Sequence, residues 1–391
     1  MMKVQDLKRS ARCLLQENIL PFWLCKMQDK ERGGWYGRIT GRGQLVKDAP
    51  RGAILYTRLL WTFSAAYRVL HDSTYLEAAS WTKDYILAHF IDSEYGGVFW
   101  SVTAEGEPLD TKKQFYAIGF ALYGFSEYAR ATGDKEALQT AIDLYHQIEI
   151  HALDHEHNGY IEAMTRNWQP IDDMRLSDKD ENYPKSQNTH LHIIEPYTNL
   201  YRIWPSKELE HSLHNLISIF TDHILNPKTH HLDLFFDMDW TRRSTTESYG
   251  HDIECSWLLH EAALVLDDKR VLEKVEPTLR KVAQASEKGL LSTGAMIHES
   301  GDADLHWWVQ AEAIVGFLNL YQHFGDEAAL EKALSLWNYV NSHLVDWVGG
   351  EWYWSIRADG TVNLVDDKAG FWKCPYHNSR MCLEILERSF P

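Results

Sequence analysis

Hydrophobic positions in this chain recur with the 3.6-residue period of amphipathic helices, and the helical segments come in pairs. Between successive pairs stands a short stretch rich in glycine and aromatic residues, which predicts a tight turn or a hairpin. The clearest examples are ERGGWYG, SEYGGVFW and WVGGEWYW. These stretches recur about every sixty residues, and such a period indicates a repeated helical hairpin.

The first helix of each pair is more aromatic and less charged than the second. The predicted first helices are 54–70, 113–131, 188–204, 249–266, 307–324 and 375–388. The predicted second helices are 75–90, 135–153, 209–225, 270–285 and 327–345. This difference places the first helices inside and the second helices outside.

The two ends of the chain complete each other. The last pair lacks its second helix, and the amphipathic segment 4–20 at the start lacks a partner. Packing of these two helices would close the repeats into a ring. The sequence therefore predicts an all-α fold, a single-domain (α/α)6 barrel of six helical hairpins over residues 1–391, with short β-hairpins and loops at one end.

Charge and composition narrow the function. The formal net charge of −17, with no cluster of basic residues, argues against nucleic acid or an anionic membrane as a partner. No apolar run approaches the ~20 residues of a membrane-spanning helix. The 5 cysteines are scattered, which indicates free thiols in a reducing compartment, so we expect a cytoplasmic protein.

Unusual polar and aromatic residues stand near the start of every predicted inner helix. They are Arg58, Tyr116, Asn188, His192, His251, Glu254, Trp308, Glu312, Trp372 and His377. In a closed ring these helix starts meet in one funnel, which makes a binding site the favoured interpretation. Structural roles stay open for single residues, since Arg58 could simply pair with Glu195 or Glu254.

Proton transfer at a carbon next to a carbonyl suits this set of side chains. Two histidines can remove and return a proton near neutral pH, because imidazole titrates there. Arg58 and Asn188 could stabilise the oxygens of an enediolate, and Glu254 could orient His251. With tryptophans to hold a sugar ring, the sequence predicts an aldose epimerase or aldose–ketose isomerase that needs no metal and no nicotinamide cofactor.

Three other functions remain open. Three converging histidines could bind zinc, although no standard zinc motif is present. A glycoside hydrolase would use two carboxylates, for which Asp180, Glu254 and Glu312 are candidates. A non-catalytic sugar-binding module would need only the aromatic and polar lining.

Four segments carry a resemblance to the N-acylglucosamine 2-epimerase superfamily: KSQNTHLHIIEPYTNLYR, YGHDIECSWLLHEA, WWVQAEA and FWKCPYHNSRMCLE. The resemblance runs from the first helix to the last and is strongest to the members that act on disaccharides. It implies an (α/α)6 barrel that interconverts glucose and mannose at the reducing end of β-1,4-linked disaccharides such as cellobiose, lactose or mannobiose. Relatives with the same barrel act on N-acylmannosamine or free mannose, so these substrates stay open, and we expect a monomer or a weak homodimer.

The resemblance also implies a role for each matched residue. His251 and His377 resemble the general acid/base pair, and His192 resembles a third histidine that helps to open and position the sugar. The substrate-binding positions correspond to Arg58, Tyr116, Asn188 and Glu254 around the reacting carbons, Asp180 and Trp308 along the sugars, and Trp372 as a platform.

Overall fold

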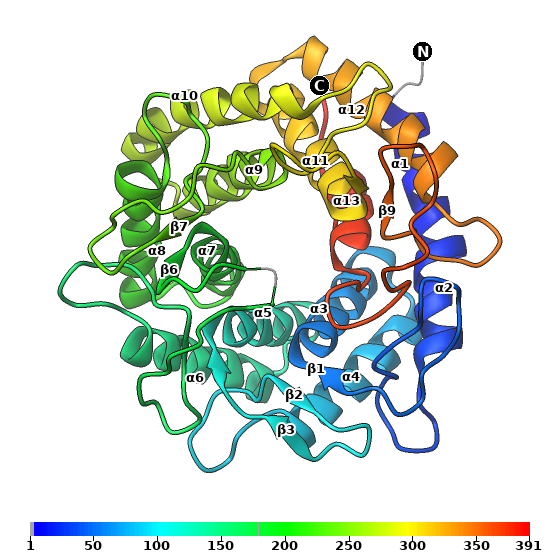
Figure 1. Ribbon diagram of the computed structural model, residues 1–391, viewed down its shortest axis with the longest axis vertical. Helices are drawn as coiled ribbons and strands as arrows, with labels where there is room; N and C mark the ends of the chain where they lie inside the picture. Colours follow the sequence, from blue (N-terminus) through cyan, green and yellow to red (C-terminus); the bar gives the residue numbers. More distant parts are fainter. Residues whose placement is uncertain (1–3, 179) are drawn as a thin grey trace.

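Two concentric rings of helices form the protein in the computed structural model, which describes residues 4–178 and 180–391 (Figure 1). The inner ring consists of α3 (Ala53–Leu70), α5 (Phe115–Thr132), α7 (Gln187–Tyr201), α9 (Tyr249–Leu266), α11 (Trp307–Phe324) and α13 (Tyr376–Glu387). Each inner helix packs against the next, and α13 packs against α3. The predicted closure of the ring is therefore confirmed.

The outer helices alternate with the inner ones along the chain. They are α4 (Ser73–His89), α6 (Lys135–His151), α8 (Lys207–Ile219), α10 (Lys269–Ser286) and α12 (Glu327–Tyr339). The sixth outer position belongs to α1 (Val4–Leu14), which packs against α13 as the sequence predicted. This first helix continues through π-helical turns and the short α2 (Leu20–Phe22) as far as Met27, beyond the predicted end at residue 20. Further π-helical turns, Phe220–Ile224 and Val340–Leu344, extend α8 and α12, and a 3₁₀ turn, Glu287–Gly289, follows α10.

Short strands lie at the end of the barrel where the inner helices begin (Figure 1). They pair antiparallel as β1 (Arg51–Gly52) with β2 (Ser101–Val102), β2 with β3 (Pro108–Asp110), β4 (Lys113–Gln114) with β5 (Ala163–Met164), β6 (Lys185–Ser186) with β7 (Phe235–Phe236), and β8 (Leu305–His306) with β9 (Ser355–Ile356). Strand β4 takes the first two residues of the helix predicted over 113–131. Each glycine-aromatic stretch contains one isolated β-bridge, such as Ile91 with Val98, so the predicted turns are confirmed.

Short local signals separate each inner helix from its outer partner. An aspartate side chain caps the start of α4, α6, α10 and α12 by accepting backbone N–H groups, as Asp134 does from Glu136 and Ala137, and Ser206 does so for α8. The residue that ends the inner helix often adopts the left-handed conformation, as Gly133 does at φ 77°. The inner helices are buried along nearly their whole length, between the outer ring and one another. Within the described residues, no helix is long and apolar enough to cross a membrane.

A repeated ion pair fixes where the inner helices begin. An aspartate in the turn after an outer helix accepts backbone N–H groups with one oxygen, as Asp154 does from Glu156 and His157. Its other oxygen binds a basic residue just before an inner helix or its turn: Asp29 with Arg51 at 2.7 Å, Asp92 with Lys113 at 2.9 Å, Asp154 with Lys185 at 2.7 Å, and Asp346 with Lys368 at 2.7 Å. Three of these clamps tie a turn to the strand before an inner helix, because Arg51, Lys113 and Lys185 lie in β1, β4 and β6, and the fourth holds the loop before α13.

Replacement of Lys185 by Met should destabilise the fold by about 3 kcal/mol, because it leaves the buried Asp154 carboxylate without its cation. The matched control is Lys274→Met, which breaks an exposed pair with Asp222 and should change stability by less than about 0.5 kcal/mol. Denaturant unfolding followed by circular dichroism measures both. Equal stability of the two variants would show that the clamp does not hold the barrel end.

Candidate active site

One cavity opens at the end of the barrel where the inner helices begin. Its volume is about 740 Å³. All ten residues predicted for the site line it: Arg58, Tyr116, Asp180, Asn188, His192, His251, Glu254, Trp308, Trp372 and His377. The convergence predicted from the closed ring is therefore found, and nine of these side chains come from the inner helices or the segment just before α13.

Three histidines of the cavity are anchored through the same ring nitrogen. Nδ1 of His251 lies 2.8 Å from Ser248 Oγ, Nδ1 of His192 lies 3.0 Å from Glu195 Oε2, and Nδ1 of His377 lies 2.6 Å from Glu312 Oε1. Among the described residues, no hydrogen bond engages Nε2 of these rings. Each imidazole is thus fixed in orientation and keeps Nε2 for a substrate.

The partner of His251 differs from the prediction. Glu254 was expected to orient this ring, but the hydroxyl of Ser248 binds its Nδ1 instead. Glu254 lies one turn further along α9 and directs its carboxylate to Arg380. A helical spacing of three residues places two side chains near the same face without making them partners.

His190 shows how a structural histidine of the same helix differs. Its Nδ1 lies 2.6 Å from the carbonyl oxygen of Ser186, and its Nε2 accepts the backbone N–H of Tyr160 at 2.9 Å. Both nitrogens are used, and the ring packs against Trp240. His190 therefore has no nitrogen left for chemistry.

Burial keeps the three cavity imidazoles neutral. It lowers the pKa of His251 to about 3, with a further contribution from His298. Burial likewise holds the pKa of His192 and His377 well below the ordinary value, and the positive charge of Arg58 adds to the effect on both. Neutral imidazoles with a free Nε2 are proton acceptors.

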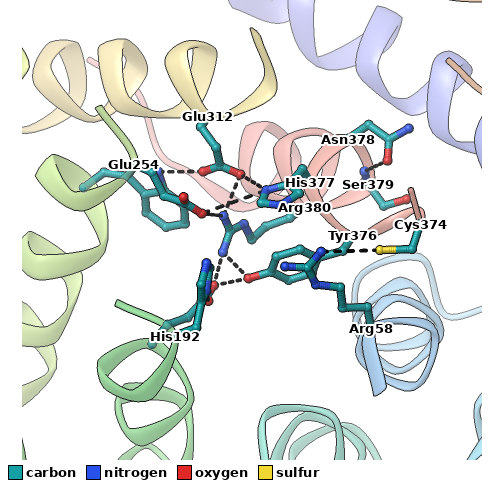
Figure 2. Close-up of polar contacts among 12 residues, drawn as sticks. Arg58, His192, Glu254, Glu312, Cys374, Tyr376, His377, Asn378, Ser379 and Arg380 are labelled. Atoms are coloured by element: carbon teal, nitrogen blue, oxygen red, sulfur yellow. Dashed lines mark hydrogen bonds and ion pairs between the residues drawn. The ribbon is translucent and has the colours of Figure 1, made fainter. Parts of the chain in front are cut away.

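A buried arginine, Arg380, connects carboxylates from three inner helices. Its Nη2 lies 2.9 Å from Glu254 of α9 and 2.6 Å from Glu312 of α11, and its Nη1 contacts Glu195 of α7. The hydroxyl of Tyr376 also contacts Glu195. Figure 2 shows the guanidinium beside Glu254 and Glu312, with Tyr376 between it and Arg58. We call Arg380, Glu195, Glu254, Glu312 and Tyr376 the Arg380 cluster.

The Arg380 cluster holds at least one proton near neutral pH. Three buried carboxylates face one guanidinium, so complete ionisation would leave uncompensated negative charge inside the barrel. Burial raises the pKa of Glu254 to about 8. Burial and the neighbouring Glu254 also raise the pKa of Glu312 well above its ordinary value. Glu312 binds Nδ1 of His377, so one of the two carboxyl groups with a raised pKa contacts a candidate acid/base residue.

Arg58 is buried without an ion-pair partner among the described residues, so the structural role considered for it, pairing with Glu195 or Glu254, is wrong. Its guanidinium donates a hydrogen bond to Tyr116 at 2.8 Å and lies 4.2 Å from the ring centroid of Phe120. An uncompensated guanidinium at a cavity attracts oxygen atoms that carry or develop negative charge.

Aromatic faces and single polar groups complete the lining. The ring of Trp308 lies 4.9 Å from His251 and 5.7 Å from His377, between centroids, so it contacts both candidate acid/base residues. Trp372 packs against Tyr116. The side-chain oxygen of Asn188 is buried without a partner among the described residues, whereas Asp180 accepts hydrogen bonds from Ser177. Flat apolar faces with isolated polar atoms suit a sugar.

Two of the alternative chemistries fit this geometry poorly. The donor atoms of His192, His251 and His377 do not form a group within 4.8 Å of one another, although two other sets of described residues do. Glu254 and Glu312 both bind Nη2 of Arg380, so they lie on one side of the cavity. Carboxylates of a glycoside hydrolase flank the scissile bond from two sides.

Two residues that support the site were not predicted as part of it. Glu195 is a polar position on the inner helix α7, and Arg380 follows His377 by three residues on α13. That spacing places Arg380 on the face of His377, which is the one signal that could have revealed it. Its partners could not be read from the sequence, because they lie 68 to 185 residues away.

Comparison with known proteins gives a consistent result along the whole chain. The family model described as N-acylglucosamine 2-epimerase matches residues 33–380. A cellobiose 2-epimerase of Bacteroides fragilis is 56% identical over 97% of this chain and 98% of its own length. A cellobiose 2-epimerase of Ruminococcus albus is 40% identical over 96% of this chain and 97% of its own length. The solved structure of cellobiose 2-epimerase from Bacillus thermoamylovorans superposes with a TM-score of 0.94 at 39% identity, over 98% of this chain and 100% of that one.

Glu162, a further carboxyl group that lines the cavity, should make stability depend on pH. Burial raises its pKa to about 7, so the folded protein binds a proton there that the unfolded chain releases above the ordinary value of 4.5. This contribution to stability is complete at low pH and is lost as the pH rises through about 7. Glu162→Gln carries no titrating group at this position. The difference in free energy of unfolding between this variant and the parent should therefore shift in favour of the variant by on the order of 2 kcal/mol when the pH rises from about 5 to about 8. Denaturant unfolding at both pH values measures the gain, whereas the exposed control Glu105→Gln should show no pH-dependent difference.

Proposed function

The chain belongs to the N-acylglucosamine 2-epimerase family and is a carbohydrate epimerase, and we propose that it interconverts glucose and mannose at the reducing end of β-1,4-linked disaccharides. Cellobiose and lactose are the substrates that this proposal names. The similarity to cellobiose 2-epimerases over almost the full length supports a disaccharide over a free monosaccharide or an N-acylated sugar.

One observation carries the mechanism: His192, His251 and His377 are anchored at Nδ1, and their Nε2 atoms have no hydrogen-bond partner among the described residues. Nε2 of His251 or His377 removes the proton on carbon 2 of the open-chain sugar, and the electron pair moves into a cis-enediolate. Rotation about the bond between carbons 2 and 3 presents the other face of the intermediate. The second histidine enters this step with a proton on Nε2 and donates it to carbon 2, so the configuration is inverted and the sugar regains the proton it lost. One proton has then passed from the second histidine to the first through the sugar, and exchange with water restores both rings.

The residues around the histidines stabilise the negative charge of the enediolate and position the sugar. Arg58 has no carboxylate partner among the described residues, so its charge is available for the enediolate oxygens. Asn188 can bind a sugar hydroxyl, because its side-chain oxygen is otherwise unsatisfied. His192 lies against Tyr116 at 4.9 Å between ring centroids, and in this scheme it assists ring opening. Trp308 and Trp372 provide the apolar faces that hold the two sugar units.

Incubation with cellobiose in heavy water should place one deuterium on carbon 2 of the product, because the proton exchanges with solvent on the histidines. Parallel incubations with lactose, mannose and N-acetylmannosamine, analysed by chromatography, define the substrate. A product without deuterium would contradict proton transfer at carbon 2. Turnover of mannose or N-acetylmannosamine but not of the disaccharides would indicate the activity of another branch of the family. Release of free glucose would identify a hydrolase.

His251→Ala and His377→Ala should each lower kcat by about 100- to 10,000-fold, because each removes a proton carrier. The control is His211→Ala, on the exposed face of an outer helix, which should retain the parental rate. Circular dichroism spectra should match the parent in all three variants. A near-parental rate in either cavity variant would assign that histidine a structural role.

Glu312→Gln should lower kcat at least ~100-fold while KM stays within a few-fold, because an amide holds Nδ1 of His377 without carrying its charge or proton. Glu312 is a positioning residue, so the pH dependence of kcat should shift as well. Glu331→Gln makes the same change at an exposed position of the outer helix α12 and should leave both kcat and the pH profile unchanged. Equal effects of the two variants would contradict a special role for Glu312.

A further inference from the structure

Three side chains with metal-binding atoms gather at one side of the cavity, away from the Arg380 cluster. They are His298, Asp302 and His306, all partly exposed, from the segment between α10 and α11. One donor atom from each lies within 4.8 Å of the other two. We propose that these residues form a binding site for a divalent transition-metal ion of the zinc type.

The separations between the donors suit a shared ion, and the shorter of them is also a hydrogen bond. Asp302 Oδ2 lies 3.2 Å from His306 Nε2 and 3.7 Å from His298 Nδ1. Two ligands of one tetrahedral zinc ion lie about 3.3 Å apart, given metal–ligand bonds of about 2.0 Å. The longer separation exceeds the length of a normal hydrogen bond and is within reach of two ligands that share one ion.

The backbone holds the three donors in place. His306 belongs to β8, which pairs with β9 through Ser355. His298 precedes a tight turn closed by the bridge between Glu299 and Asp302, and Gly301 occupies that turn at φ 97°. A side chain at Gly301 would be strained in this conformation, so the turn depends on glycine.

Asp302 is also oriented by a second contact. Its Oδ1 accepts the backbone N–H of Asp304 at 2.9 Å, which leaves Oδ2 directed to the two imidazoles. Contacts of this kind fix ligand orientation in metal sites. Nε2 of His298 is buried without a hydrogen-bond partner among the described residues and lies 3.9 Å from Glu299, which adds negative charge beside the site.

The chemistry of the donors selects the ion. Two imidazoles and one carboxylate form a three-ligand set that leaves a coordination position open for water or a sugar hydroxyl. Imidazole nitrogen favours zinc, cobalt, nickel or copper over magnesium and calcium, which prefer oxygen ligands. The other cluster of potential donors, Glu254, Glu312 and His377, differs because the guanidinium of Arg380 already binds both carboxylates.

The site would place an ion beside residues of the proposed reaction. The ring of His298 lies 5.2 Å from Trp308 and 6.1 Å from His251, between centroids. A bound ion would fix His298 against Trp308 and change the shape of this side of the cavity. The inference concerns binding at this site and does not require the ion to take part in catalysis.

The whole chain is first freed of metal with a chelator and dialysed. It is then titrated with Co²⁺, with visible absorption as the readout, and separately with Zn²⁺ by calorimetry. We expect one tight equivalent and the intense absorption of four-coordinate Co²⁺. His306→Ala and Asp302→Asn should each weaken binding at least ~10-fold, because each removes a ligand. His146→Ala removes a histidine from an exposed histidine–carboxylate pair with Glu208 on outer helices and should bind as the parent does.

The outcomes separate this site from adventitious binding. Absence of a tight equivalent in the parent, or unchanged binding in both ligand variants, would overturn the proposal. Equal loss in the His146→Ala control would also overturn it. Unfolding midpoints measured in the presence of chelator verify that the variants fold. If His306→Ala is unstable, loss of the four-coordinate Co²⁺ absorption in Asp302→Asn still supports the site. Because the readout is metal binding and not turnover, failure here would leave the proposed epimerase function untouched.

Discussion

The ion pairs of Arg380 hold together the part of the barrel on which the site depends. This one side chain reaches from α13 to carboxylates on α7, α9 and α11, so four of the six inner helices meet at one guanidinium (Figure 2). A buried charge cluster of this kind contributes little as long as it is complete, and it becomes costly when one member is lost. It therefore serves less to stabilise the fold than to fix how these helices are rotated and how far apart they lie.

The Arg380 cluster also sets the chemistry above it. Glu195 and Glu312 are held from one side by Arg380 and bind Nδ1 of His192 and His377 on the other. Each carboxylate thus transmits a fixed orientation from the barrel interior to an imidazole at the cavity. His251 stands outside this arrangement, with a neutral hydroxyl from Ser248 as its partner. The two proposed proton carriers consequently differ in electrostatic environment, which fits a pair that works in opposite directions.

Close packing of two inner helices places a third element of the site. Pro196 has no backbone N–H, so the carbonyl of His192 loses its usual helical partner. A side chain on Gly119 of α5 would lie 2.4 Å from that carbonyl oxygen, and only glycine permits this approach. Tyr116, one turn earlier on α5, is thereby brought against the ring of His192. A proline and a glycine on neighbouring helices thus determine the spacing at which Tyr116 and Arg58 meet the histidines.

The ring and ten of the residues that line the cavity could be predicted from the order of residues alone. Helical periodicity, the glycine-aromatic turns and the complementary ends predicted six hairpins, and the polar residues at the helix starts predicted which side chains converge. These properties are local or repeated, so they can be read along the chain. The pairings could be seen only in the folded protein: Ser248 and not Glu254 binds His251, and Arg58 has no carboxylate partner within the described part of the chain. A pairing depends on how each helix is rotated about its axis and on neighbours far away in sequence, and neither is encoded in the spacing of residues.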